Sequence, residues 1–278
     1  MPGRLILCAT PIGNLEDAPP RLASELAEAD IVYAEDTRRT RVLLQHLGID
    51  ADVRSYFVGN EHARAIELGR RLGDGETAVL VTDAGMPGIA DPGLSAVQAA
   101  IEAGVEVTVV PGASAVTAAL AVSGLPADRF VFEGFLPRKP GQRARRLGAL
   151  SEEPRTIVFF AAPSRVAEDL TAIAAAFGGD RRVAVARELT KLHEEVFRGT
   201  AMEAARRWTE DIAPRGEFTL VVEGALMPSR GIDELVSEVG VAVEAGHRLS
   251  AAVKDVADRS GTSRRVLYEA ALKARDDA

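Results

Sequence analysis

TAVLVTDAGMPGIADPG occupies residues Thr77–Gly93 and joins an unbroken apolar run to a long loop. The run TAVLV has no polar face, which is typical of a parallel strand that is covered by helices on both sides. The loop Thr82–Gly93 holds three glycines, two prolines and the carboxylates of Asp83 and Asp91, more than a simple turn needs. Ligands in open α/β sheets bind beyond the carboxyl ends of the strands. We therefore predict that this loop forms part of a ligand site.

Two further loops follow apolar strands in the same way. ATPIGNL (Ala9–Leu15) follows the predicted strand Arg4–Cys8, and PGASA (Pro111–Ala115) follows Val105–Val110. The first loop has neither the dinucleotide-binding glycine pattern nor a P-loop, and by itself fits an ordinary strand–helix turn. In the loop PGASA, the third of the three, Ser114 is positioned to cap the next helix. Because all three loops are predicted at one edge of one sheet, together they indicate a compact, partly apolar ligand held mostly by backbone groups.

Predicted strands and helices alternate through the chain, which implies an α/β fold. The stretch Leu125–Pro137 breaks this rhythm and is interpreted as a strand and a connector that lead to a second domain. Ala225–Gly231 has the composition of a linker. From Leu249 onward only helices are predicted, with the spacing of a helix-turn-helix around Gly261. We predict α/β domains over residues 1–126 and 127–228 and a helical extension over residues 229–278. Helices are predicted over 19–29, 37–47, 63–72, 115–122, 164–176, 202–208 and 232–245, and further strands over 31–34, 156–161, 182–187, 196–199 and 217–223.

Composition narrows the class of protein. The chain has 278 residues and one cysteine, so internal disulfides and multi-cysteine metal sites are excluded. Its four histidines argue against a histidine-rich metal centre, and we predict no metal. No apolar run approaches the length of a membrane span, and the first residues are interpreted as a strand rather than a signal peptide. These features predict a cytoplasmic protein. The net charge of −8 argues against sequence-blind binding of naked nucleic acid.

Two local stretches carry positive charge in spite of that balance. RKPGQRARR (Arg138–Arg146) follows the predicted connector and is interpreted as an RNA contact rather than only a solvated face. AEDTRRT (Ala34–Thr40) opens a helix with Asp36 as its N-cap. Arginines in the first turn do not complement the helix dipole, so they are candidates for phosphate contacts. The predicted RNA-binding residues are Arg38, Arg39, Lys139, Arg143, Arg145 and Arg146.

Six motifs occur in a fixed order along the chain. They are ATPIGNLED (9–17), AEDTRRT (34–40), TDAGMPGIADPG (82–93), PGASAVTAALAVSGL (111–125), FEGFLPRK (132–139) and RELTKLHEEVFRGT (187–200). Together they resemble the tetrapyrrole methylase superfamily, in its branch that methylates small-subunit ribosomal RNA, over nearly the whole chain. Met86, Gly88 and Ala113 depart from the family pattern, at positions of turns or backbone contacts.

The resemblance implies two α/β domains of the class III methyltransferase type, with S-adenosyl-L-methionine bound in a cleft between them. It implies methyl transfer to the ribose 2′-hydroxyl of a cytidine in the decoding region of 16S rRNA, within the small ribosomal subunit, by a homodimer. Carried over motif by motif, the cofactor contacts are Pro11, Ile12, Gly13, Asp83, Gly85, Pro87, Ser114, Ala115, Phe160 and Ala161.

The chemistry of such a transfer leaves the catalytic base open. The activated methyl group makes positioning a large part of the rate, but the hydroxyl proton must still leave. Glu35, Asp36, Glu188 and Lys191 are the candidates, and Lys191 would require a lowered pKa. A small-molecule methylase of the same fold and a non-enzymatic RNA- or DNA-binding regulator are alternatives. The basic stretch and helical tail favour RNA over a tetrapyrrole, and the three loops argue against a pure binder.

Overall fold

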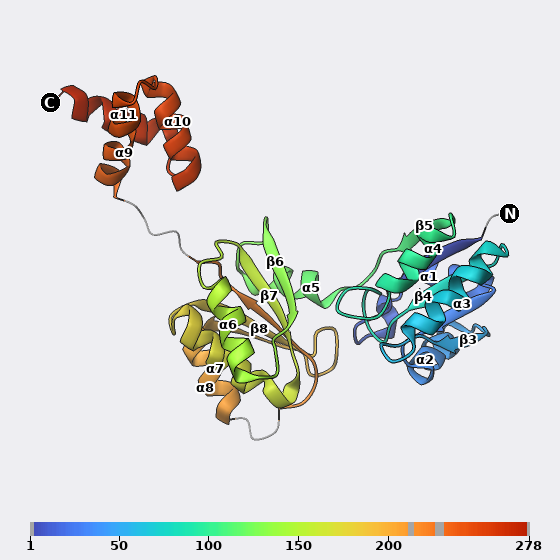
Figure 1. The fold of residues 1–278 in the computed structure, drawn as a ribbon. Coiled ribbons are helices and arrows are strands. Elements are labelled where there is room, and N and C mark those ends of the chain that lie inside the picture. Colours follow the sequence, from blue (N-terminus) through green and yellow to red (C-terminus); the bar gives the residue numbers. More distant parts are fainter. Residues whose placement is uncertain (1–2, 211–213, 226–230, 277–278) are drawn as a thin grey trace. The chain divides into compact units, whose positions relative to one another are not determined.

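The structure is a computed structural model that describes residues 3–210, 214–225 and 231–276 (Figure 1). The chain forms two compact units, Met1–Glu223 and Gly224–Ala278. The larger unit contains two sheets of five strands each, so the two expected α/β domains are two sheets of one compact unit. The predicted boundary between residues 228 and 229 lies outside the described residues.

The first sheet is parallel throughout. Its strands stand in the order β3-β2-β4-β1-β5. They are β1 (Arg4–Cys8), β2 (Ile31–Ala34), β3 (Val53–Ser55), β4 (Thr77–Val81) and β5 (Glu106–Val110). The strands β4, β1 and β5 are neighbours, so the three predicted loops leave the sheet side by side at its carboxyl edge. The prediction of one shared edge is therefore confirmed.

Helices cover both faces of this sheet, which explains the absence of a polar face in its strands. The four helices are α1 (Pro20–Glu28), α2 (Thr37–Leu47), α3 (Glu61–Gly73) and α4 (Leu94–Glu102). In β1, Leu5 and Leu7 pack in the cluster that includes side chains of α3 and α4. Ile6 and Cys8 alternate with them and pack in the cluster with α1 and α2. Successive side chains thus face opposite layers, both of them apolar.

The second sheet is mixed, which the sequence did not predict. Its order is β6-β7-β10-β8-β9, and only the β6–β7 pair is parallel. Its strands are β6 (Phe130–Phe135), β7 (Thr156–Ala161), β8 (Arg182–Arg187), β9 (Glu195–Thr200) and β10 (Phe218–Val222).

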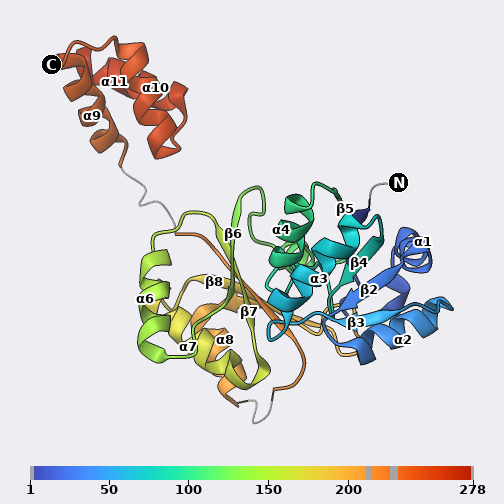
Figure 2. The same ribbon diagram turned by 45° about the vertical axis from the view of Figure 1, so that its right-hand side comes forward.

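Two sets of helices flank this second sheet. Residues of α6 (Pro140–Leu150), α7 (Val166–Phe177) and α8 (Ala201–Glu210) share one core cluster with it, on one side in Figure 2. The helix α5 (Ala115–Ser123) belongs to a separate cluster and packs against β8 and β10. Because α5 begins where the third loop of the first sheet ends, it carries that loop to the second sheet.

One strand and two α-helices escaped prediction, each for a local reason. The strand β3 has only three residues, all of them partly exposed, so it shows no burial pattern. The helix α4 follows directly on the long loop, and its small residues give weak amphipathicity. The helix α6 was interpreted by its charge alone, yet Leu147 and Leu150 lie on one buried face of it.

The smaller unit consists of helices, as predicted. It contains α9 (Ile232–Glu244), α10 (Leu249–Ser260) and α11 (Arg264–Asp276) around a shared apolar core. Gly261 ends α10 in the left-handed region with φ of 69°, and Ala257 and Leu267 are buried on either side of this turn. Among the residues that the structure describes, none of the helices could cross a membrane.

Candidate active site

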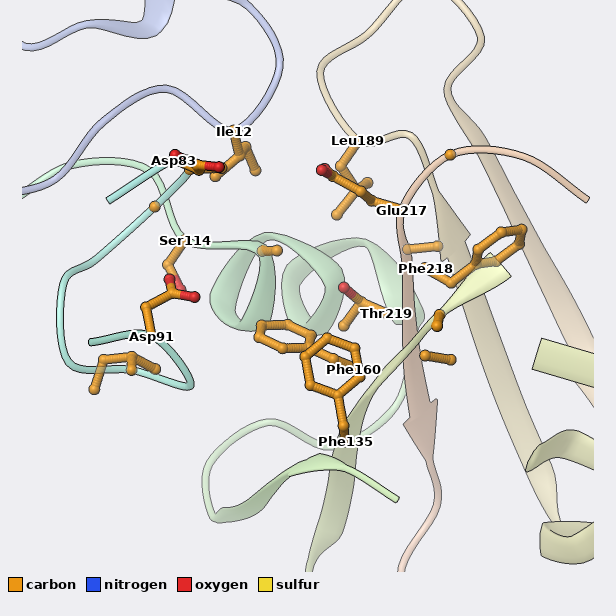
Figure 3. A pocket seen from close by; sticks show the side chains of 18 of the residues that line it. Ile12, Asp83, Asp91, Ser114, Phe135, Phe160, Leu189, Glu217, Phe218 and Thr219 are labelled. Atoms are coloured by element: carbon orange, nitrogen blue, oxygen red, sulfur yellow. The ribbon is translucent and has the colours of Figure 1, made fainter. Parts of the chain in front are cut away.

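A pocket of about 370 Å³ lies where the loops of the first sheet meet the second sheet, within the larger unit (Figure 3). Its volume is in the range of sites for small organic ligands. One wall comes from the first sheet and its loops and includes Ile12, Glu35, Arg39, Asp83, Gly85, Met86, Ile89, Asp91, Ser114 and Ala115. The other comes from the second sheet and includes Phe135, Phe160, Ala161, Ala186, Leu189, Gly216, Glu217, Phe218 and Thr219.

Seven of the ten predicted cofactor contacts line this pocket: Ile12, Asp83, Gly85, Ser114, Ala115, Phe160 and Ala161. Pro11, Gly13 and Pro87 are not among the lining residues. Pro11 and Pro87 are buried. Gly13 serves a different contact, since a Cβ there would lie 2.4 Å from Cγ of Lys191 and 2.9 Å from Oγ1 of Thr190. The absent side chain lets the first loop approach the loop that follows β8.

Gly85 is required by the backbone conformation of its loop. Its φ is 83°, a region that side chains disfavour, and it exchanges two backbone hydrogen bonds with Thr10 at 2.9 and 3.1 Å. A Cβ at this position would meet nothing closer than 3.6 Å. The sequence predicted a close approach of ligand to this glycine. The structure adds that a branched residue here would strain the loop itself.

Ser114 occupies the N-cap position of α5, as predicted, but its side chain makes no capping hydrogen bond. The prediction that its hydroxyl caps the helix is therefore wrong. The side chain lines the pocket instead (Figure 3). Its hydroxyl is thus available to a ligand.

The second-sheet wall carries aromatic rings. The ring of Phe160 lies 5.6 Å from that of Phe135 and 5.0 Å from that of Phe132, between centroids. Phe135 is 55% exposed although it lines the pocket. Such a surface is suited to a planar ring, because aromatic faces pack favourably in offset or tilted contact.

The first-sheet wall is acidic. Asp83 accepts a hydrogen bond from the backbone N–H of Asp36 at 2.9 Å and lies 3.5 Å from the guanidinium of Arg39. The N–H of Asp83 donates to Glu35 at 3.4 Å. Partial burial raises the pKa of Glu35, although this hydrogen bond opposes the shift. Burial and the neighbouring carboxylates of Glu35 and Asp83 raise the pKa of Asp91 to about 7.

Of the four predicted bases, only Glu35 lines the pocket. Asp36 is the N-cap of α2, as predicted, and accepts hydrogen bonds from the backbone and side chain of Arg38. These bonds hold the pKa of Asp36 well below its usual range. A carboxylate stabilised in this way is a weak base.

Lys191 could act as a base only if its pKa were lowered, and the structure shows the opposite. Its ammonium lies 2.8 Å from Glu188 and 3.0 Å from Glu217. Partial burial alone would lower the pKa of Lys191, but these hydrogen bonds raise it overall. For Glu188 the effects have the opposite sign. Burial alone would raise the pKa of Glu188, but the hydrogen bonds from Lys191 and from the backbone of Glu217 lower it overall. Both groups remain charged at neutral pH, and Lys191 holds Glu217 at the pocket wall instead.

The predicted RNA-binding residues divide into distinct groups. Arg143 is a correction: it is buried and pairs with Asp169 at 3.2 Å and Glu168 at 3.3 Å, so it has no surface to offer a phosphate. Arg146 is held by both carboxylate oxygens of Glu133. Arg145 and Lys139 are exposed.

The two arginines of α2 also differ. Arg38 turns back onto Asp36, although its side chain is largely exposed. Arg39 lines the pocket and pairs with Asp83. Of the pair, Arg39 is therefore the one placed at the site itself.

Sequence reasoning missed several lining residues. Asp91 stood in the quoted loop motif but was left out of the predicted site. Glu217, Phe218 and Thr219 come from the start of β10, more than 100 residues beyond the first-sheet loops, and no motif marked them. Phe135 is the last residue of β6 and belongs to the quoted FEGFLPRK segment. The sequence did not indicate that its ring is exposed rather than buried in the core.

Comparison with known proteins agrees with this architecture. Residues 4–205 match the family model of the tetrapyrrole (corrin/porphyrin) methylases. A solved uroporphyrin-III C-methyl transferase from Thermus thermophilus, complexed with S-adenyl homocysteine, is 20% identical with a TM-score of 0.56, over 78% of this chain and 96% of that one.

Two curated relatives are far more similar in sequence. The ribosomal RNA small subunit methyltransferase I of Mycobacterium tuberculosis (strain CDC 1551 / Oshkosh) is 48% identical over 98% of this chain and 96% of its own. The protein of the same name from Synechocystis is 44% identical over 99% of both chains. The chain therefore belongs to the tetrapyrrole methylase family of methyltransferases and, within it, groups with the proteins named ribosomal RNA small subunit methyltransferase I.

Proposed function

We propose that this protein transfers a methyl group from S-adenosylmethionine to the ribose 2′-hydroxyl of a cytidine in the decoding region of 16S rRNA. The observation that carries the proposal is the pocket itself. It unites an aromatic wall and an acidic wall at the loop edge where the motifs of this family occur. The names of the close relatives support small-subunit RNA as the substrate.

The residues of the pocket fit this cofactor. Its adenine needs a flat apolar surface, which Phe135 and Phe160 supply, and its sulfonium is a cation. Glu35, Asp83, Asp91 and Glu217 line the pocket against one lining cation, Arg39, in the described part of the chain. This excess of negative charge favours a positively charged ligand.

The chain's own residues orient the reacting groups. When bound, the cofactor supplies an electrophilic methyl group. The loops of β1, β4 and β5 fix the cofactor side through backbone and the Ser114 hydroxyl, while the second sheet forms the opposite wall. Positioning of this kind is a large part of the rate for an already activated group.

The test has two stages. Calorimetry should give one S-adenosylmethionine per chain, with binding unchanged by a chelator. The protein should then transfer labelled methyl to small ribosomal subunits from a strain that lacks this gene, and mass mapping should place it on a ribose of a cytidine. Transfer to a tetrapyrrole but not to subunits would contradict the proposal, as would activity that requires an added metal ion.

The proposal extends to the setting of the enzyme: a homodimer that acts in the cytoplasm on the small ribosomal subunit. Family membership supports this assignment. Sedimentation of the purified chain tests the dimer, and comparison of free 16S rRNA with assembled subunits tests the substrate.

Exposed cations near the second sheet should position the RNA. Replacing Lys139 and Arg145 together by alanine is expected to weaken subunit binding and to flatten its log–log salt dependence by up to about two units, about one for each lost phosphate contact. S-adenosylmethionine affinity should be unchanged, since neither residue lines the pocket. The matched control is Arg21→Ala with Arg70→Ala, which removes two exposed arginines from helices that cover the first sheet. An unchanged salt slope in the K139A/R145A variant would mean that the stretch is only a solvated face.

A further inference from the structure

Asp91 projects into the pocket from the loop between β4 and α4. Figure 3 shows it on the first-sheet wall with Asp83 and Ser114, across from Thr219. The loop that carries it is anchored, because Gly88 donates a backbone hydrogen bond to Pro92 at 3.2 Å and Gly85 pairs with Thr10. Pro92 and Gly93, which follow Asp91, are buried. The carboxylate is therefore held on a defined backbone at the site.

The other carboxylates of the pocket have assigned partners. Asp83 is held by the N–H of Asp36 and by Arg39, and Glu217 is held by Lys191. Glu35 accepts the N–H of Asp83. Asp91 makes no salt bridge within 4.0 Å among the described residues. Its carboxylate is thus the one on this wall that is not neutralised by a cation or engaged by a backbone N–H in that part of the chain.

We propose that Asp91 is the general base of the methyl transfer, an assignment that rests on the proposed function. The hydroxyl oxygen of the ribose forms a bond to the methyl carbon while the carbon–sulfur bond breaks and its electron pair stays on sulfur. The hydroxyl proton passes to the carboxylate of Asp91, which later releases it to solvent. Charge and atoms balance, and no further reactant is needed.

The surroundings of Asp91 suit this task. Burial is the main influence on it, and the carboxylates of Glu35, Asp83 and Glu217 act in the same direction, while the hydroxyl of Thr82 opposes them. Together they raise the pKa of Asp91 to about 7, and a base works best when its pKa is near the working pH. A sulfonium that enters the pocket favours the ionised form of Asp91. Cofactor binding near neutral pH should therefore release a proton.

Proton release gives a test that needs no RNA. Calorimetry of S-adenosylmethionine binding near neutral pH, in buffers of different ionisation enthalpy, should show net proton release for the unmodified protein. Release should be lost in Asp91→Asn and kept in Asp128→Asn, whose side chain is 80% exposed away from the pocket. Persistent release from D91N would assign the titration to another group and overturn the proposal.

Single-turnover methylation of small subunits, with cofactor saturating, supplies the second readout. The rate of the unmodified protein should rise with pH along an acid limb that lies below about 7, because the bound sulfonium favours the ionised carboxylate of Asp91. D91N should fall by about 100-fold or more, in the range for loss of a general base, and lose this acid limb. Glu35→Gln removes a neighbouring negative charge, so its acid limb should move to lower pH, with a plateau at least about tenfold above that of D91N.

Each failure has a distinct signature. A folded D91N that methylates within about threefold of the unmodified protein overturns the assignment. Loss of activity at every pH in E35Q, with D91N active, makes Glu35 the base. A D91N that cannot be saturated with cofactor makes Asp91 a binding residue only.

If D91N does not fold, an E35Q acid limb that fails to move overturns the proposal. If the unmodified protein binds the cofactor but does not methylate subunits, the proposed function fails and the assignment fails with it.

Discussion

Replacing Ser114 by tryptophan is expected to reduce S-adenosylmethionine affinity by about 100-fold or more, which corresponds to at least about 2.7 kcal/mol of binding free energy. The side chain of Ser114 lines the pocket and makes no capping hydrogen bond, so the substitution removes no structural contact of that hydroxyl. The indole instead occupies volume that the ligand needs. Calorimetry measures the affinity, and circular dichroism checks that the variant is folded.

The matched control is Thr117→Trp, on an exposed position of the same helix and outside the pocket lining. It adds the same ring to the same segment at a position that does not line the pocket, and should bind the cofactor as the unmodified protein does. Normal affinity in a folded S114W variant would place the cofactor elsewhere. Equal losses in both variants would point to damage to α5 rather than to filling of the pocket.

Replacing Trp208 by alanine is expected to cost about 3–5 kcal/mol of unfolding free energy, the range for removal of a large aromatic side chain from a core. Trp208 is 2% exposed and stands edge-on to Phe197 and Phe218, with centroids 5.4 and 6.2 Å away. Because Phe218 lines the pocket, the loss of this support should also weaken cofactor binding. Urea unfolding followed by circular dichroism is the measurement, since Trp208 is the one tryptophan of the chain.

Met202→Ala is the control for that experiment. It removes a large side chain from the same helix, but one that is 43% exposed. Its cost should stay well below that of W208A, because partly exposed side chains leave little cavity behind. A loss below about 1 kcal/mol in W208A would mean that the neighbouring rings close over the vacated space.

Prediction from sequence succeeded where local order and burial coincide. The strands Arg4–Cys8, Ile31–Ala34, Thr77–Val81, Thr156–Ala161 and Arg182–Arg187 were predicted with the bounds that the structure gives. Strands with apolar side chains on both faces are stable when they are buried between two apolar layers. The three loops followed from the same fact, since parallel neighbouring strands must release their loops at one edge. The family resemblance supplied seven lining residues, and five of them stand in these three loops.

The sequence could not predict which charged groups each ionisable side chain contacts. Arg143 belongs to a basic string, yet its helix turns it inward to Asp169, which is wholly buried. Lys191 was conceivable as a base until Glu188 and Glu217 proved to be its neighbours. Asp91 belongs to the quoted loop motif, but its raised pKa depends on burial and on the carboxylate of Glu35, which follows another strand. In each case at least one deciding group is distant in the chain: Asp169 for Arg143, Glu217 for Lys191 and Glu35 for Asp91.

What the sequence by itself determined is therefore the layered fold, the edge at which the site forms and the family, because hydrophobic periodicity and motif order are local properties of the chain. Only the tertiary structure decided the mixed second sheet, the contribution of Glu217–Thr219 to the pocket and the charge state of each candidate base. The physical reason is that burial and electrostatic coupling depend on distances in space, and those distances exist only when β10 and the first-sheet loops have come together.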